Sequence, residues 1–73
     1  MKAKNAIVGT TVKIKRSSKW YREGGVSNPI GTTGKVISFN PEDADAGEFC
    51  IRVEWSNGWK NCYRLIDLKV VKG

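Results

Sequence analysis

Residues 49–64, FCIRVEWSNGWKNCYR, contain the clearest structural pattern in the sequence. From Phe49 to Trp55 apolar and polar residues alternate, which is the period of a half-buried β-strand. The dipeptide Asn57-Gly58 follows, and it is the most typical short connection between two antiparallel strands. Residues 59–64 then form the return strand. The stretch therefore predicts a β-hairpin.

A two-residue loop at Asn57-Gly58 sets the register of this hairpin, because residues directly opposite each other point to the same face. In that register Val53 pairs with Cys62 and Arg52 pairs with Tyr63. Asn57 is expected to take a positive-φ turn position, and Asn61 to satisfy a nearby backbone group. The residues expected inside are Phe49, Ile51, Val53, Trp55 and Cys62. Those expected outside are Arg52, Glu54, Trp59 and Tyr63.

Three other segments have strand patterns, namely residues 11–15, 34–39 and 68–72. The segment 16–33 is rich in turn-forming residues and is expected to be a long irregular loop. Residues 40–48 are interpreted as an exposed acidic loop, and Leu65 to Asp67 as one short turn. No segment shows helical periodicity over enough residues to predict a long helix. The sequence predicts one all-β domain over residues 1–73, a five-stranded SH3-like small antiparallel barrel with a long first loop. A five-stranded OB-fold is the alternative, although it usually needs a longer chain.

Composition narrows the function. The chain has 73 residues, 13 Lys and Arg, 7 Asp and Glu, no His and a formal net charge of +6. No run approaches the roughly 18 apolar residues that span a bilayer, and the first residues are too polar for a signal peptide. Without His there is no ordinary general base near neutral pH. We therefore expect that the protein is not an enzyme and that it has no cofactor, no small-molecule substrate and no membrane partner.

The two cysteines are expected to be free. The hairpin register puts Cys50 and Cys62 on opposite faces, and a disulfide needs converging side chains with Cα atoms within about 7 Å. Two Cys also provide no four-thiolate metal site. Free thiols predict a reducing compartment, and hence a cytoplasmic location.

The acidic segment has two interpretations. Its four carboxylates have the chemistry of a divalent-cation site, and Asp43-x-Asp45 begins like an EF-hand loop. Ala46 and Gly47 do not continue that pattern, so a solvated surface loop is favoured and no metal site is predicted. The carboxylates are Glu42, Asp43, Asp45 and Glu48.

Charge is unevenly distributed along the chain. Residues 1–41 contain eight basic residues and one acidic residue, a net charge of +7, whereas residues 42–73 contain five basic and six acidic residues, a net charge of −1. Positive charge beside aromatic residues is typical of nucleic-acid binding. Lys13, Lys15 and Arg16 are the candidate phosphate ligands. The alternative is a solubilising surface.

Aromatic residues give the candidate partner-binding surface. In the long loop, Trp20 and Tyr21 are flanked by cations, a combination that suits peptides and bases, although one ring is expected to pack into the barrel mouth. The outer stripe of the hairpin is either a second part of the contact surface or is covered by the long loop. The candidate partner-binding residues are Lys19, Trp20, Tyr21, Arg22, Arg52, Trp59 and Tyr63.

The hairpin also resembles a known family. Residues 51–64, followed by Asp67-Leu-Lys-Val70, are similar to the V-x-W-x-N-G-x-x-N-x-Y-R and D-L-x-V pattern of the Mind bomb–HERC domain. The first half of the chain follows the family's order with Gly9-x-x-Val12, Trp20 and Gly31-Thr-x-Gly34-x-Val36. The chain departs from the family in two places: the spacer before Asp67 is shorter, and Glu23-Gly24-Gly25 replaces the family's Asp-Gly-Gly element.

The resemblance implies an SH3-like barrel that binds peptide segments of other proteins. Stand-alone chains of this pattern look like phage-encoded proteins, which implies an accessory or host-directed role in the host cytoplasm. The predicted function is therefore a non-catalytic module that recognises a protein or peptide, with an acidic partner favoured. A nucleic-acid-binding barrel that uses its basic aromatic face is the alternative.

Overall fold

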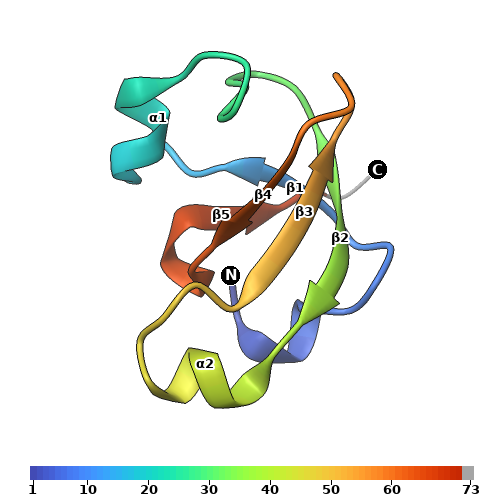
Figure 1. Cartoon of the computed structure of the whole chain (residues 1–73), viewed down its shortest axis with the longest axis vertical. Helices are drawn as coiled ribbons and strands as arrows, with labels where there is room; N and C mark the ends of the chain where they lie inside the picture. The colour runs from blue at the N-terminus through green and yellow to red at the C-terminus, as the bar shows by residue number, and fades with distance from the viewer. Residues whose placement is uncertain (72–73) are drawn as a thin grey trace.

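In the computed structural model, which describes residues 1–71, five antiparallel strands form one sheet in the order β4-β3-β2-β1-β5 (Figure 1). The strands are β1 (Thr11–Ile14), β2 (Gly34–Phe39), β3 (Ile51–Trp55), β4 (Lys60–Tyr63) and β5 (Leu68–Val70). Short helical segments connect them, namely η1 (Ala3–Asn5), α1 (Lys19–Glu23), α2 (Pro41–Asp45) and η2 (Leu65–Asp67). The predicted all-β fold with five antiparallel strands is confirmed. Lys72 of the predicted last strand and Gly73 lie outside the described residues.

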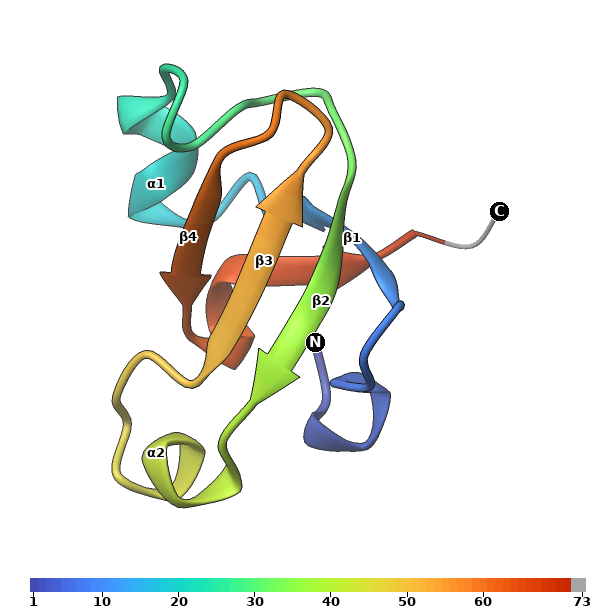
Figure 2. The ribbon, with the colours of Figure 1, turned by 45° about the vertical axis from the view of Figure 1, so that its right-hand side comes forward.

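The sheet curves into a barrel-like shape but does not close. Strand β1 pairs with both β2 and β5, whereas β4 and β5 are the two ends of the strand order. Figure 2 shows β2, β3 and β4 side by side, with β5 crossing behind them. A register shift between Val36 and Ser38 interrupts the β2–β3 pairing, and such bulges increase strand bending.

Alternation on the strands builds the core. The inward residues of β3 are fully buried and the residues between them are exposed. Gly34 allows β2 to pack closely on this strand, because a Cβ at that position would lie 2.6 Å from the Trp55 ring and 2.7 Å from Val53 Cγ1. The buried hydrophobic residues are Ala6, Val12, Ile14, Val36, Cys50, Ile51, Val53, Trp55, Tyr63 and Leu68.

The hairpin loop has three residues instead of the expected two. The Trp55 amide donates to the Trp59 carbonyl at 2.8 Å, and the Gly58 amide donates to the Trp55 carbonyl at 2.9 Å. Gly58 takes the positive φ, 90°, whereas Asn57 does not. Instead, the Asn57 side chain accepts a hydrogen bond from the Trp59 amide at 3.0 Å. This pattern matches the three-residue hairpin loop with a glycine bulge.

The longer loop moves the β3–β4 register by one residue. Arg52 lies opposite Cys62, and Ile51 lies opposite Tyr63. A shift of one residue moves every side chain of a strand to the other face. The predicted positions of Tyr63 and Cys62 were therefore wrong: Tyr63 is fully buried and Cys62 is exposed.

The start of β3 also differs from the expectation. Phe49, predicted to point inward, is 41% exposed, and Cys50 is buried in its place. The Cys50 amide donates to the Tyr63 carbonyl at 3.0 Å, so the chain enters β3 with Cys50 turned to the core. Both thiols are free, as predicted, but Cys50 is the buried one.

Two segments expected as irregular loops contain one helical turn each. Helix α1 begins after Ser18, whose hydroxyl accepts from the Trp20 amide at 3.1 Å, and ends at Gly24 with a φ of 57°. Helix α2 begins after Asn40, whose side chain accepts from the Glu42 amide at 3.0 Å. Ser, Asn and Gly are the usual start and stop residues of helices. Five residues are too few to produce a recognisable periodicity. No helix of residues 1–71 is long and apolar enough to cross a membrane.

Candidate binding surface

A buried carboxylate holds α1 and η2 together. The Ser18 hydroxyl donates to Asp67 Oδ1 at 2.8 Å, and the Arg64 amide donates to Asp67 Oδ2 at 3.1 Å. Asp67 is 5% exposed. One side chain therefore fixes the first turn of α1 against the residue that precedes η2, although these segments are far apart in the sequence.

Four side chains form a row across this junction. Lys19 Nζ lies 4.6 Å from the centroid of the Trp20 ring, and the Trp20 ring lies 6.0 Å from the Phe49 ring at an interplanar angle of 53°. The Arg64 guanidinium lies 5.0 Å from the Phe49 centroid. Cations over aromatic faces are attracted by the ring quadrupole. Along the row the order is therefore cation, ring, ring and cation.

The exposed side chain of Ile66 adds an apolar group beside Arg64. We call these five residues the α1–η2 surface: Lys19, Trp20, Phe49, Arg64 and Ile66.

Two donors of this surface have no acceptor within the described residues. Trp20 Nε1 and Arg64 Nε are both buried and form no hydrogen bond. A buried donor left unpaired costs about 1–3 kcal/mol. The row is therefore stabilised by its ring contacts while two of its polar atoms are unsatisfied.

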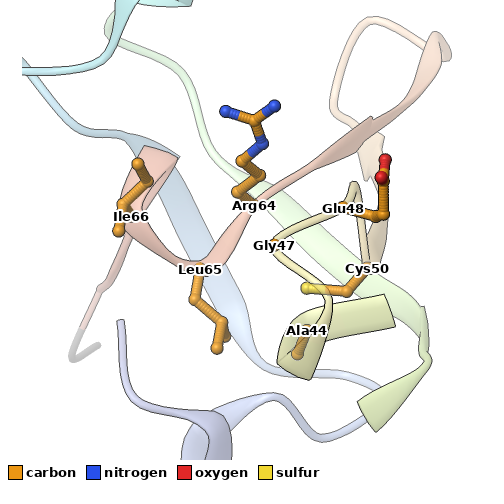
Figure 3. Close-up of a pocket in the computed structure, with 7 residues that line it drawn as sticks. All are labelled: Ala44, Gly47, Glu48, Cys50, Arg64, Leu65 and Ile66. Carbon is orange, nitrogen blue, oxygen red and sulfur yellow. The ribbon is translucent and has the colours of Figure 1, made fainter. Parts of the chain in front are cut away.

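A pocket of about 300 Å³ opens beside Arg64 (Figure 3). We call it the Arg64 pocket. Figure 3 shows Arg64 and Glu48 with their charged ends directed away from its floor, where Leu65, Cys50 and Ala44 lie. Burial raises the pKa of the Cys50 thiol, so the thiol stays neutral and contributes to an apolar floor. The lining residues are Ala44, Gly47, Glu48, Cys50, Arg64, Leu65 and Ile66.

A second hollow lies on the other side of Arg64. It has a volume of about 270 Å³ and includes Lys19 and Asp67. Arg64 and Ile66 border both hollows. They therefore form a ridge between them, which gives the α1–η2 surface two depressions for side chains of a ligand.

Helix α1 separates the four predicted residues that it carries. Trp20 packs toward Phe49, but Tyr21 lines a different pocket together with Lys13 and Arg16. Lys19 and Arg22 are exposed. Trp20 and Tyr21 are both half-buried and packed against the core, where the sequence led us to expect only one of the two rings. Lys15 is exposed on the segment after β1.

Tyr63 does not belong to any contact surface, and its prediction as a partner-binding residue was wrong. Trp55 Nε1 donates to the Tyr63 hydroxyl at 2.9 Å, and this hydroxyl donates to Asn28 Oδ1 at 2.8 Å. The two rings are packed edge to face, 5.6 Å apart. Burial raises the pKa of Tyr63. Asn28, itself buried, brings the long loop over this tyrosine.

The long loop also runs along the hairpin. Asn57 Nδ2 donates to the Val26 carbonyl at 3.0 Å, and Asn61 Nδ2 donates to the Ser27 carbonyl at 3.1 Å. The long loop thus contacts the hairpin through these two asparagines, whereas Tyr63 lies on the inner face in the observed register and does not belong to an outer stripe. Trp59, in contrast, is 51% exposed at the tip of the hairpin.

Arg52 is exposed on β3. It borders a hollow that it shares with Phe49 and Cys62. Arg52 is therefore a neighbour of the α1–η2 surface through Phe49, whereas the backbone of Trp59 is hydrogen-bonded to Trp55 and Asn57 at the tip of the hairpin.

The sequence did not single out Phe49, Arg64 or Ile66 as contact residues. Phe49 was assigned to the core by alternation, and Arg64 was noted only within the family pattern. The order Arg64-Leu-Ile-Asp67 offers one signal, because an apolar residue in a short turn after a strand is often exposed. Among residues 1–71, no group of three or more Cys, Asp or Glu side chains is placed to hold a metal ion.

The comparison with known proteins provides evidence about the fold only. The chain matches no protein-family model, and it matches no curated protein sequence. It is similar to the solution structure of the Bacillus subtilis protein YorP, with a TM-score of 0.64 and 22% sequence identity. The match covers 92% of this chain and 70% of YorP. This likeness supports a shared small all-β architecture.

Proposed function

We propose that this protein is a non-catalytic module that binds a peptide segment of another protein on its α1–η2 surface. The observation that carries the proposal is the row of Lys19, Trp20, Phe49 and Arg64, with two buried donors that lack acceptors. Aromatic rings and Arg are the residue types enriched in the centres of protein interfaces.

The unpaired donors favour a peptide over a purely apolar ligand. An extended peptide presents a carbonyl at every residue, and such carbonyls are the kind of acceptor that Trp20 Nε1 and Arg64 Nε lack. Satisfying a donor that is unpaired in the free protein recovers part of the 1–3 kcal/mol that its burial costs. Binding is then stronger than the ring contacts alone would make it.

The charges of the surface favour an acidic peptide with an apolar side chain. Lys19 and Arg64 stand at the two ends of the row, and the whole chain has a net charge of +6. The floor of the Arg64 pocket suits an apolar residue of the partner. An acidic residue next to it would meet Arg64, and Arg52 and Arg22 would add to the electrostatic attraction.

A binding role is favoured over catalysis for chemical reasons. The chain has no His, and burial raises the pKa of Cys50, which makes this thiol a poor nucleophile. Two free thiols suit a reducing compartment such as the cytoplasm. The resemblance to stand-alone Mind bomb–HERC-like chains favours a phage accessory or host-directed protein.

Selection from a random peptide library against the immobilised protein tests the proposal. We expect acidic peptides with one apolar anchor. Their affinity should fall about tenfold in Ile66→Ser, since removing a central apolar contact typically costs more than 1 kcal/mol.

Val8→Ser is the matched control, because Val8 and Ile66 are both 69% exposed but Val8 lies outside the α1–η2 surface. A selection that yields no peptides, or equal losses in the two variants, would contradict the proposal.

A further inference from the structure

The pocket that Tyr21 lines lies between β1, β5 and α1, and it is strongly basic. Its volume is about 160 Å³, and its charged residues are Lys13, Arg16 and Lys69. Tyr21, Ile14 and Gly31 complete the lining, and none of the lining residues is acidic. We call it the β1–β5 basic pocket. It shares no residue with the α1–η2 surface.

The arrangement of Lys13 and Lys69 is unusual within this sheet. They lie directly opposite each other on β1 and β5, where like charges are destabilising. The strands pair their other outward lysines with an acid: Lys35 and Lys60 both lie opposite Glu54. In the free protein Lys13 and Lys69 therefore remain a repulsive pair, and Arg16 adds a third positive charge beside them. An anion between them would relieve the repulsion.

We propose that the β1–β5 basic pocket binds a phosphate of single-stranded nucleic acid, with a neighbouring base stacked on Tyr21. Three observations favour this ligand. The cations are complementary to phosphate in charge. The half-buried ring of Tyr21 lies in the same pocket, and bases stack on aromatic side chains beside basic grooves. Gly31 contributes no side chain that would close the wall.

This site differs from the one that the sequence suggested. Lys13 and Arg16 are retained, whereas Lys15 is not among the lining residues. Lys69 comes from the other end of the chain and was not predicted. The inference goes beyond peptide recognition, because the two sites use different residues and lie on different sides of α1.

Fluorescence anisotropy with a labelled oligomer of twelve thymidines, at about 50 mM salt, tests the proposal. The double variant Lys13→Gln/Lys69→Gln should weaken binding at least tenfold. The control Lys35→Gln/Lys60→Gln removes the same charge from the sheet and should bind like the wild type. Equal losses in the two double variants would overturn the site in favour of a diffuse charge effect.

Salt dependence supplies a second readout. Each phosphate that is neutralised on a single strand contributes about −0.7 to the slope of log K against log salt. The slope should therefore become shallower by about 0.7 in Lys13→Gln/Lys69→Gln, because the phosphate in the pocket is no longer neutralised, and stay unchanged in the control. Tyr21→Leu keeps the bulk of the side chain and should weaken binding roughly fivefold or more, because the stacked base is lost.

Lys13→Glu separates binding from folding. It replaces the repulsive pair by an opposite-charge pair, so the thermal midpoint should rise while binding of the oligomer is lost. A stabilised variant that still binds the oligomer would overturn the proposal.

Two competitors identify the source of the anion. Hexaglutamate and inorganic phosphate are each titrated against the bound oligomer. The proposal requires the oligomer to bind more tightly than either. If hexaglutamate binds as tightly as the oligomer or more tightly, the proposal is overturned in favour of an acidic peptide. If the protein binds phosphate but not the oligomer, the proposal is overturned in favour of a free anion. Ile66→Ser should bind the oligomer normally, which keeps this test independent of the peptide surface.

Discussion

The Ser18 hydroxyl donates a hydrogen bond of 2.8 Å to the carboxylate of Asp67, 49 residues further along the chain. The same hydroxyl accepts from the Trp20 amide, and the other carboxylate oxygen accepts from the Arg64 amide. One buried pair therefore positions the two ends of the row of cations and rings, namely α1 and Arg64. The binding surface depends on a contact that itself touches no ligand.

Replacing Asp67 is expected to destabilise the protein strongly. In Asp67→Ala the buried Ser18 hydroxyl and the part-buried Arg64 amide lose their acceptor, and at about 1–3 kcal/mol each the free energy of unfolding should fall by about 2–6 kcal/mol. Ser18→Ala should cost about 1–2 kcal/mol, as the loss of a helix cap does. Urea unfolding measures both. Because the two residues interact, the double variant should lose less than the two single variants together; strict additivity would argue against the coupling.

Gly34→Ala is expected to lower the free energy of unfolding by about 1–3 kcal/mol, the usual cost of overpacking. The added methyl group would meet the Trp55 ring and Val53 Cγ1 at 2.6 and 2.7 Å. Thermal unfolding monitored by tryptophan fluorescence is the measurement. Lys35→Ala, at the exposed neighbouring position, is the control and should change stability little. Equal stability of Gly34→Ala and wild type would show that β2 can move away from β3.

Tyr63 should make the protein sensitive to alkali. Burial raises its pKa above the usual 10.0, so the unfolded chain ionises at a lower pH than the folded one. The contribution to stability is complete below about pH 10 and is lost as the pH rises from there toward the folded pKa.

Tyr63→Phe should lose about 1–3 kcal/mol at neutral pH, because Trp55 Nε1 loses its acceptor. Above pH 10 its stability should fall less steeply than that of the wild type. Urea midpoints between pH 8 and 11 give the comparison. Parallel curves would contradict the role assigned to Tyr63.

The two thiols should differ in reactivity. Cys62 is exposed and Cys50 is buried, with a pKa raised mainly by that burial. Thiolate formation and access both control alkylation. Iodoacetamide should modify Cys62 at least about tenfold faster than Cys50, as measured by peptide mass after digestion. In strong denaturant the rates should converge. Equal rates in the native protein would place Cys50 at the surface.

Local patterns in the sequence predicted the strands but not the faces of the hairpin. Alternation is a property of neighbouring residues, and the predicted bounds of β2 match those observed. The length of the hairpin loop depends on competing local geometries, and the dipeptide Asn57-Gly58 is compatible with the three-residue loop as well as with the more typical two-residue one. The three-residue form is accompanied by a bond from Tyr63 to Asn28, 35 residues away, and no short-range pattern encodes that partner.

The candidate site was even less accessible from the sequence. Trp20 meets Phe49, which lies 29 positions later, and the outward direction of Phe49 follows from the bond between the Cys50 amide and the Tyr63 carbonyl. A strand pattern extended by one residue assigns that ring to the core. The cations and aromatic residues at positions 19–22 were visible in the sequence, whereas the placement of Lys19 and Tyr21 at two different pockets requires the position of α1.

The two ends of the open sheet have a further consequence. In the observed registers the Cys62 amide points away from β3 and the Leu68 carbonyl points away from β1. Asn61 Oδ1 accepts from the first at 2.9 Å, and the amino group of Met1 donates to the second at 2.8 Å. Unpaired edge groups invite strands of other molecules and lead to aggregation. The two bonds therefore reduce the number of free backbone groups that each end of the open sheet offers to a strand of another molecule.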